Sequence, residues 1–355
     1  MGFSPRGKFS AILAFTTRCQ GRGPFDQSET AMIQYLYLGR VGYDEGLRLQ
    51  DEMAALVAEG RAQNVLLLLE HPPVLTLGRN AHRTNILASD ELLARRGVTI
   101  HEINRGGDVT YHGPGQLVGY PIFDLRALRN PSGGRMGPVD FVRQMEEALI
   151  RLCLGFGVHA GRVAGLTGVW CGLADSGLSG GLPPAQPIAA DHGRTGPERK
   201  IGAIGIHVSR GITSHGFAFN VTTNLDDFGL IIPCGIPDHA VTSLEKEIRQ
   251  PQAAQTGPVQ TGSAQTEDAQ TGAEHAAASR TAALPSLEAI ADQAARQFAQ
   301  VFGEQLLAVE SLEALRAHSA ARPQSSAPVP AEDTPLQIPP EVEQLRGGSE
   351  RPVRA

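Results

Sequence analysis

The succession of hydrophobic and polar positions divides this chain into strand-like and helix-like segments. Apolar runs and alternating stretches predict strands over residues 32–38, 65–69, 74–79, 98–103, 117–125, 168–171, 199–208 and 215–221. Apolar residues at helical spacing predict helices over residues 43–59, 90–96, 139–156 and 286–302. Gly60 is placed to end the first helix, and Ser286 to cap the last. Because strands and helices intersperse without a regular β–α–β repeat, the pattern favours an α+β fold.

Several segments lack any such pattern, and they set the predicted domain boundaries. Residues 252–283 repeat Gln-Thr every five positions and cannot bury enough apolar area to order themselves. The expected organisation is a disordered extension or misassigned start at 1–31, a folded domain at 32–249 with an inserted loop at 172–198, a low-complexity insertion at 250–285, C-terminal helices of the same domain at 286–318, and a disordered tail at 319–355.

Composition and charge exclude several classes of function. With 355 residues and a formal net charge of -6, the chain offers no electrostatic basis for binding nucleic acid. No apolar run approaches the ~20 residues of a membrane-spanning helix, so no membrane association is expected. None of the four cysteines forms a CxxC pair, so neither a zinc site nor a redox motif is predicted. Wide cysteine spacing favours reduced thiols and a cytoplasmic location.

The stretch from Arg105 to Gln116 carries more specific chemistry than a surface turn needs. It holds four glycines, one proline and six polar side chains in twelve residues. A plain glycine-rich loop between two strands would explain the glycines and the proline, but not the arginine, threonine, histidine and glutamine. Glycines allow a backbone to come close to a ligand, and the polar side chains supply donors. We therefore interpret this stretch as a ligand-binding loop.

Cys234 is the first candidate for catalysis. It lies between a proline and a glycine, where a cysteine is poorly placed for packing, whereas Cys153 beside a helical stripe is expected to be a core residue. A nucleophilic thiol needs activation, which a neighbouring cation can provide. Lys200 begins an otherwise apolar strand and could be that cation, or simply a solvated strand end. The histidines at 71, 112, 207 and 215 are further candidates.

Five blocks in order resemble the signature of the lipoyl(octanoyl) transferase family of lipoate biosynthesis. They are Glu70-His71-Pro72 through Thr76-Leu77-Gly78-Arg79; Arg105-Gly106-Gly107-x-x-Thr110-x-His112-x-x-Gly115-Gln116-x-x-x-Tyr120; Arg199-Lys200-Ile201 with Ala203-Ile204-Gly205; Gly216-Phe217-Ala218-x-Asn220; and Pro233-Cys234-Gly235. The resemblance covers about residues 32–247 and the helix after Ser286. It implies the biotin/lipoyl protein ligase type of fold, a mixed sheet flanked by helices. The segments that depart from the family lie outside these blocks.

The resemblance also implies an activity and a site. Octanoyl would pass from octanoyl-acyl carrier protein to a lysine on the lipoyl domains of 2-oxoacid dehydrogenase E2 subunits and on the glycine cleavage H protein. The thioester would form on Cys234, with Lys200 as its partner, and neither metal nor cofactor is expected. The implied acyl pocket comprises Arg105, Gly106, Gly107, Asp108, Val109, Thr110, Tyr111, His112, Ala203, Ile204, Gly205, Gly216, Phe217 and Ala218. A monomer is expected.

Two other functions stay open on the sequence. An ATP-dependent lipoate–protein ligase relative would share the fold, although adenylation chemistry needs no nucleophilic thiol. A non-catalytic protein that binds lipoyl domains would lack the nucleophile, whereas Cys234 is present. Transfer without ATP separates the three.

Overall fold

The computed structural model describes residues 32–130, 133–172, 198–232, 240–249 and 284–321, which all belong to one compact unit beginning at Ala31. The predictions for residues 1–31, 173–197, 250–283 and 322–355 therefore lie outside the described residues.

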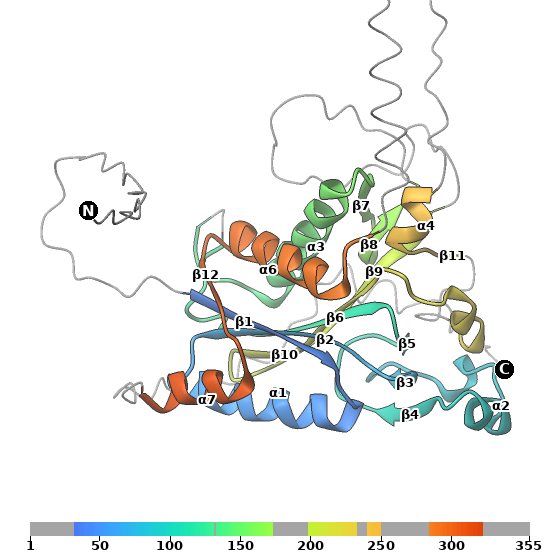
Figure 1. Cartoon of the computed structure of the whole chain (residues 1–355), viewed down its shortest axis with the longest axis horizontal. Coiled ribbons are helices and arrows are strands. Elements are labelled where there is room, and N and C mark those ends of the chain that lie inside the picture. The colour runs from blue at the N-terminus through green and yellow to red at the C-terminus, as the bar shows by residue number, and fades with distance from the viewer. Residues whose placement is uncertain (1–31, 131–132, 173–197, 233–239, 250–283, 322–355) are drawn as a thin grey trace, which may run out of the picture. The chain divides into compact units, whose positions relative to one another are not determined.

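A large mixed sheet forms the centre of this unit (Figure 1). Its strand order is β12 (Gln305–Ala308), β1 (Met32–Arg40), β2 (Asn64–Glu70), β6 (Gln116–Ile122), β10 (Ile212–Asn220), β9 (Arg199–Ser209), β8 (Leu166–Cys171) and β7 (Ala160–Val163), with β11 (Ala240–Val241) paired to β9. Strand β1 runs parallel to both neighbours, and β11 runs parallel to β9; the other pairs are antiparallel. A second sheet has the order β4 (Thr99–Glu102), β3 (Val74–Leu77) and β5 (Val109–His112). The mixed sheet confirms the expected fold class.

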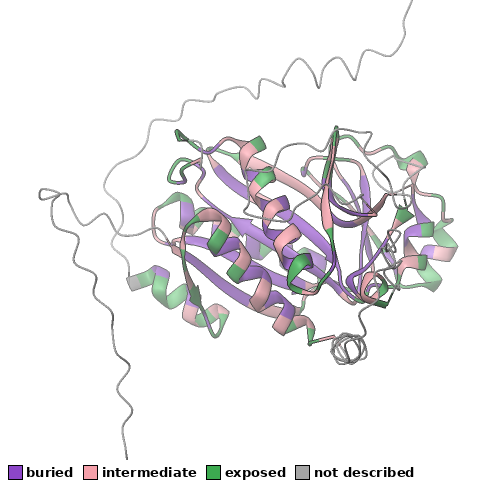
Figure 2. Cartoon of the chain, turned by 90° about the horizontal axis from the view of Figure 1, so that it is seen from above, coloured by how far each residue is buried: buried purple, intermediate pink, exposed green. Residues whose placement is uncertain are grey.

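Helices cover both faces of the large sheet, as Figure 1 shows. On one face lie α3 (Pro138–Gly155) and α6 (Leu287–Phe302), and on the other α1 (Tyr43–Ala58) and α7 (Leu312–Ala321). The shorter helices are α2 (Asp90–Arg95), α4 (Leu244–Arg249) and the 3-10 turns η1 (Arg83–Asn85) and η2 (Leu225–Leu230). Figure 2 shows buried strands between helices whose outer surfaces are exposed.

Each face of the large sheet has its own apolar core. The core on one side includes Phe141 of α3, Phe298 of α6 and Phe219 of β10, whereas the core on the other side includes Met53 of α1 and Leu67 of β2. All five side chains are fully buried. Burying one side chain of this size contributes about 1.5–3 kcal/mol, so the apolar stripes read from the sequence suffice to hold these helices on the sheet.

The predicted helix boundaries near α6 are confirmed. The hydroxyl of Ser286 accepts a hydrogen bond of 3.2 Å from the backbone N–H of Ala289, which caps the helix. Gly303 ends it with a φ of +70°, a left-handed conformation that glycine adopts without a steric penalty.

Four details differ from the sequence-based expectation. Residues 109–112, taken as part of a loop, form the buried strand β5. Residues 286–318 are not helical throughout, because β12 lies between α6 and α7 and pairs with β1. Helix α7 continues to Ala321, so the predicted tail begins too early at 319; Ser319 is buried and donates to the carbonyl of Leu315. Strand β7 was not predicted, because its four residues are only partly buried and carry no clear alternation.

Candidate functional site

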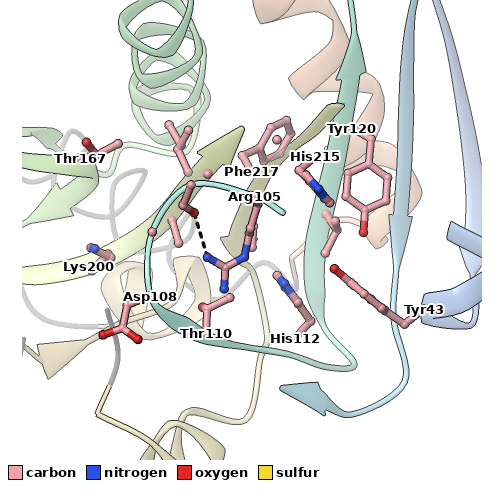
Figure 3. Close-up of a pocket in the computed structure, with 18 residues that line it drawn as sticks. Tyr43, Arg105, Asp108, Thr110, His112, Tyr120, Thr167, Lys200, His215 and Phe217 are labelled. Carbon is pink, nitrogen blue, oxygen red and sulfur yellow. Dashed lines mark hydrogen bonds between the residues drawn. The ribbon is translucent and has the colours of Figure 1, made fainter. Parts of the chain in front are cut away.

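A cavity of about 170 Å³ lies between the two sheets. One wall comes from β9 and β10 of the large sheet, and the opposite wall from residues 105–108 and β5 of the small sheet (Figure 3). The small side chains Ala203 and Ala218 are direct cross-strand partners in the first wall. They leave space that larger residues would fill.

The turn at residues 105–107 is fixed by Arg105. Its guanidinium donates 2.7 Å and 2.9 Å hydrogen bonds to the backbone and side-chain oxygens of Thr76, and a 3.0 Å bond to the carbonyl of Gly106. The N–H of Gly106 donates to the carbonyl of Ile206 at 3.0 Å. This approach requires glycine at 205, since a Cβ there would lie 2.7 Å from the Gly106 oxygen. The glycine-rich pattern thus reflects close contact between two backbones.

The alternation of β5 divides its side chains between the cavity and the small-sheet core. Thr110 and His112 line the cavity. Val109 and Tyr111 point away, are fully buried in the small-sheet core, and do not line it. The Tyr111 hydroxyl instead donates to Asp227 at 2.9 Å. The other predicted pocket residues all line the cavity, namely Arg105, Gly106, Gly107, Asp108, Thr110, His112, Ala203, Ile204, Gly205, Gly216, Phe217 and Ala218.

A chain of hydrogen bonds sets the protonation of His112. The amide of Gln116 donates to Asn220 at 2.9 Å, so its oxygen is the acceptor for Nδ1–H of His112 at 2.8 Å. Asn220 in turn donates to the carbonyl of Thr242 at 2.9 Å. Burial lowers the pKa of His112 to about 3, and it is therefore neutral at pH 7.

Two more histidines beside the cavity are held neutral. His71 receives a 2.6 Å hydrogen bond from the hydroxyl of Tyr120 at Nε2, and its Nδ1 donates to the carbonyl of Val41 at 2.7 Å. His215 has a φ of +57° and forms a 2.7 Å hydrogen bond with Asn104. Burial lowers the pKa of both His71 and His215 to about 4. These histidines consequently add no charge to the cavity at neutral pH.

Lys200 lines the cavity near the beginning of β9. Its Nζ lies 4.5 Å from the centroid of the Trp170 ring on the neighbouring strand β8, a cation–π contact. Its carbonyl accepts a 2.9 Å hydrogen bond from the N–H of Thr242, which follows β11. Gly168, on the strand beside it, has a φ of +122°, and a Cβ there would lie 2.6 Å from the carbonyl oxygen of Gly202.

Cys234 lies outside the described residues. The residues on either side of its segment are described. Ile232 donates to the carbonyl of Asn85 at 2.8 Å, and the Asn85 amide donates to the cavity-lining Asp108 at 2.5 Å. On the other side, Ala240 pairs with Arg199, next to Lys200.

Several lining residues were not predicted: Tyr43, Val118, Tyr120 and Thr167. Tyr120 stands in a signature block, so block membership was a usable signal for it. His215, which was named only among the candidate histidines, also lines the cavity. Tyr43 begins α1, and a helix start gives no sign that its ring reaches a cavity formed by other elements.

Two negative findings hold for the described part of the chain. No group of three or more His, Cys, Asp or Glu side chains there could hold a metal ion. No helix there is long and apolar enough to span a membrane.

Comparison with known proteins identifies the class first. Residues 42–258 match the family model of the lipoyl protein ligase A/B catalytic domain. A solved structure of lipoate-protein ligase A bound with ATP superimposes with a TM-score of 0.49 at 12% identity, over 81% of this chain and 92% of that one. The family-model match shows that residues 42–258 belong to the lipoyl protein ligase A/B catalytic domain family.

Closer sequence relatives narrow this class. The chain is 51% identical over 281 residues to an octanoyltransferase of Acidobacterium capsulatum, over 79% of this chain and 94% of the relative. It is 52% identical over 217 residues to an octanoyltransferase of Koribacter versatilis, over 61% of this chain and 76% of the relative. The chain belongs to the octanoyltransferase family.

Proposed function

We propose that this enzyme transfers an octanoyl group from octanoyl-acyl carrier protein to a specific lysine of lipoyl domains, through a thioester on Cys234 with Lys200 as its partner. The acceptors would be the lipoyl domains of 2-oxoacid dehydrogenase E2 subunits and the glycine cleavage H protein. The reaction needs neither cofactor nor metal, and the enzyme acts as a monomer in the cytoplasm.

The observation that carries this proposal is the position of Lys200. It shares one cavity with Arg105 and Gly107, which come from a distant part of the chain. The cavity walls on β9 and β10 include glycines and alanines, and Ala203 pairs directly with Ala218. This small pair leaves space for an extended alkyl chain whose carbonyl lies near the lysine.

The anchors of the segment that contains Cys234 support the same assignment. Cys234 follows Ile232 by two residues in the sequence. Ile232 is tied through Asn85 to Asp108 on the cavity wall, and Ala240 is tied to β9 beside Lys200. Both anchors lie at residues that adjoin the cavity.

The chemistry follows in two balanced steps. The thiolate of Cys234 attacks the donor thioester carbonyl, and the tetrahedral adduct expels the carrier thiolate. The acceptor lysine amine then attacks the acyl-enzyme, loses one proton and expels the Cys234 thiolate. Lys200 as ammonium stabilises the thiolate and gives its proton to the departing carrier thiolate; as the neutral amine it then accepts the proton of the attacking nitrogen. Backbone N–H groups near Gly205 or Cys234 are candidates for stabilising the oxyanion.

Intact-mass measurement after mixing with octanoyl-acyl carrier protein, without ATP, tests the proposal. The wild-type protein should gain one octanoyl group that hydroxylamine removes, whereas Cys234→Ala should gain none and transfer none. Transfer by Cys234→Ala at a wild-type rate would reject the nucleophile. A strict requirement for ATP and free octanoate would favour the ligase alternative, and lipoyl-domain binding without any transfer would favour the non-catalytic one.

Lys200→Arg separates the two roles of the lysine. Arginine keeps a positive charge but does not give up its proton near neutral pH. The variant should still be alkylated readily at Cys234 by iodoacetamide, yet transfer should fall by about 10²–10⁴-fold. The pH dependence of alkylation is compared in wild type, Lys200→Ala and Lys200→Arg. Identical profiles in all three would show that Lys200 does not act on Cys234.

A further inference from the structure

The cavity has two chemically different ends. Figure 3 shows Lys200, Asp108 and Thr167 on one side, and Tyr43, Tyr120 and His215 on the other. An acyl group whose carbonyl is processed near Lys200 must therefore extend its methyl end toward the second side. Whatever closes that side limits how long the chain can be.

The ring of Tyr43 is held rigidly at this far end. Tyr43 is buried, and its ring stacks on His112 with a centroid distance of 6.2 Å and an interplanar angle of 14°. The ring of His71 meets it edge-on at 5.0 Å, and that of His101 lies at 4.9 Å. His71 is itself fixed by two hydrogen bonds. Tyr43 thus forms a wall rather than a movable side chain.

In the part of the chain that the structure describes, truncating the Tyr43 side chain would break no side-chain hydrogen bond, in contrast to truncating its neighbours. Tyr120 and His215 each form a side-chain hydrogen bond, to His71 and Asn104 respectively, so truncating either would leave a polar partner unsatisfied. No hydrogen bond to the Tyr43 hydroxyl is found among the described residues. A smaller residue at 43 would therefore lengthen the cavity without leaving a polar partner behind.

The surroundings of Tyr43 suit an alkyl terminus. The imidazoles of His71, His112 and His215 are uncharged at neutral pH, as shown above, so these three rings present no charge to the end of the chain. A methyl group against the Tyr43 ring buries apolar area on both partners. A longer chain would have to displace the ring into the packed histidines behind it.

We propose that Tyr43 is a specificity-determining residue whose ring ends the acyl cavity and sets the maximum chain length that the enzyme transfers. This inference rests on the proposed function, because it assumes that the carbonyl end of the acyl group lies near Lys200. It concerns the selection among acyl chains and assigns Tyr43 no part in bond formation.

The test compares hexanoyl-, octanoyl-, decanoyl- and dodecanoyl-acyl carrier protein as donors. Wild type should strongly prefer octanoyl over dodecanoyl, since a pocket discriminates about 10–200-fold per misfitting methylene at best. Tyr43→Ala should shift the dodecanoyl-to-octanoyl ratio of kcat/KM upward by at least about 10-fold. Tyr43→Phe should keep the wild-type ratio, because the ring and not the hydroxyl forms the wall. Tyr37→Ala, a half-buried tyrosine on β1 outside the cavity lining, is the matched control and should also keep it.

The measured quantity is the ratio of kcat/KM values for two donors, so a loss of activity that affects both donors equally leaves the ratio unchanged. If Tyr43→Ala fails to fold, Tyr43→Leu replaces it and should give an intermediate shift. Calorimetric binding of the free fatty acids repeats the comparison without catalysis. A wild type that binds octanoate but transfers nothing overturns the proposed function and still tests Tyr43. A folded Tyr43→Ala protein with the wild-type chain-length profile overturns the role of Tyr43 alone.

Discussion

The ammonium nitrogen of Lys200 lies over the indole ring of Trp170, 4.5 Å from its centroid. Trp170 is fully buried in β8, so the ring cannot turn away from the lysine without disturbing the core. The contact connects the proposed catalytic lysine to a buried ring that does not itself line the cavity.

Trp170→Leu should impair transfer more than Trp170→Phe, which keeps an aromatic face. A cation–π contact contributes about 0.5–2 kcal/mol, which corresponds to a difference of about 2- to 30-fold in kcat/KM. Both variants shorten a buried side chain, so their unfolding free energies are measured in parallel. Equal kcat/KM values for the two variants would mean that the ring does not position Lys200.

Gly205→Ala should destabilise the protein and slow the reaction. The new methyl group would lie 2.7 Å from the Gly106 carbonyl oxygen and push the 105–107 turn away from β9. Overpacking of this kind costs about 1–3 kcal/mol, measurable by urea unfolding. Gly155→Ala at the exposed end of α3, where no atom lies within 4 Å of the added Cβ, is the control and should change stability by less than about 1 kcal/mol. Equal effects of the two changes would contradict the close approach.

Stability should fall as the pH falls from about 6.5 toward 4. The pKa of each of His71, His112 and His215 is depressed in the folded state, so below pH 6.5 the unfolded chain binds protons that the folded protein does not. Each imidazole contributes a slope of up to about 1.4 kcal/mol per pH unit. Urea unfolding between pH 7.5 and 5 measures this slope. His112→Gln should reduce the slope of unfolding free energy against pH by the contribution of one histidine. An unchanged slope would show that His112 is protonated in the folded state.

Replacing residues 252–281 by a short glycine–serine linker should leave transfer intact. The deletion retains Leu284, which packs against the core. The removed residues contain too few large apolar side chains to form a core of their own. Ending the chain after Ala321 should be equally harmless, whereas ending it after Arg316 removes the buried Ser319 and should destabilise α7. A folded linker variant without activity would reveal a role for the replaced segment.

The hydrophobic pattern predicted the elements that carry long apolar stripes. The stripe of α1 includes Met53 and Val57, and that of α6 includes Ile290 and Phe298; all four are buried as expected. Strand β12 escaped prediction because three of its four residues are exposed, and its pairing with β1 is a long-range contact that leaves no local pattern.

Sequence reasoning found those site residues whose role is visible in the neighbouring sequence. The glycines of the 105–116 stretch and Arg105 are examples. Val109 and Tyr111 were included because the stretch was taken as a loop, in which all side chains could face a ligand; in a strand every second one turns away. Tyr43 was missed because its role depends on how α1 packs against the histidines of other elements.

The pairing of β1 with β12 has a consequence for the order in which the molecule can be completed during synthesis. Met32 lies opposite Gln305, and Tyr35 opposite Ala308, so one side of β1 has no partner until residues 305–308 have been synthesised. Helix α6, which covers the core on that side, emerges equally late. Until then the nascent chain exposes a strand edge and an apolar surface, which makes this period the one in which chaperones are most needed.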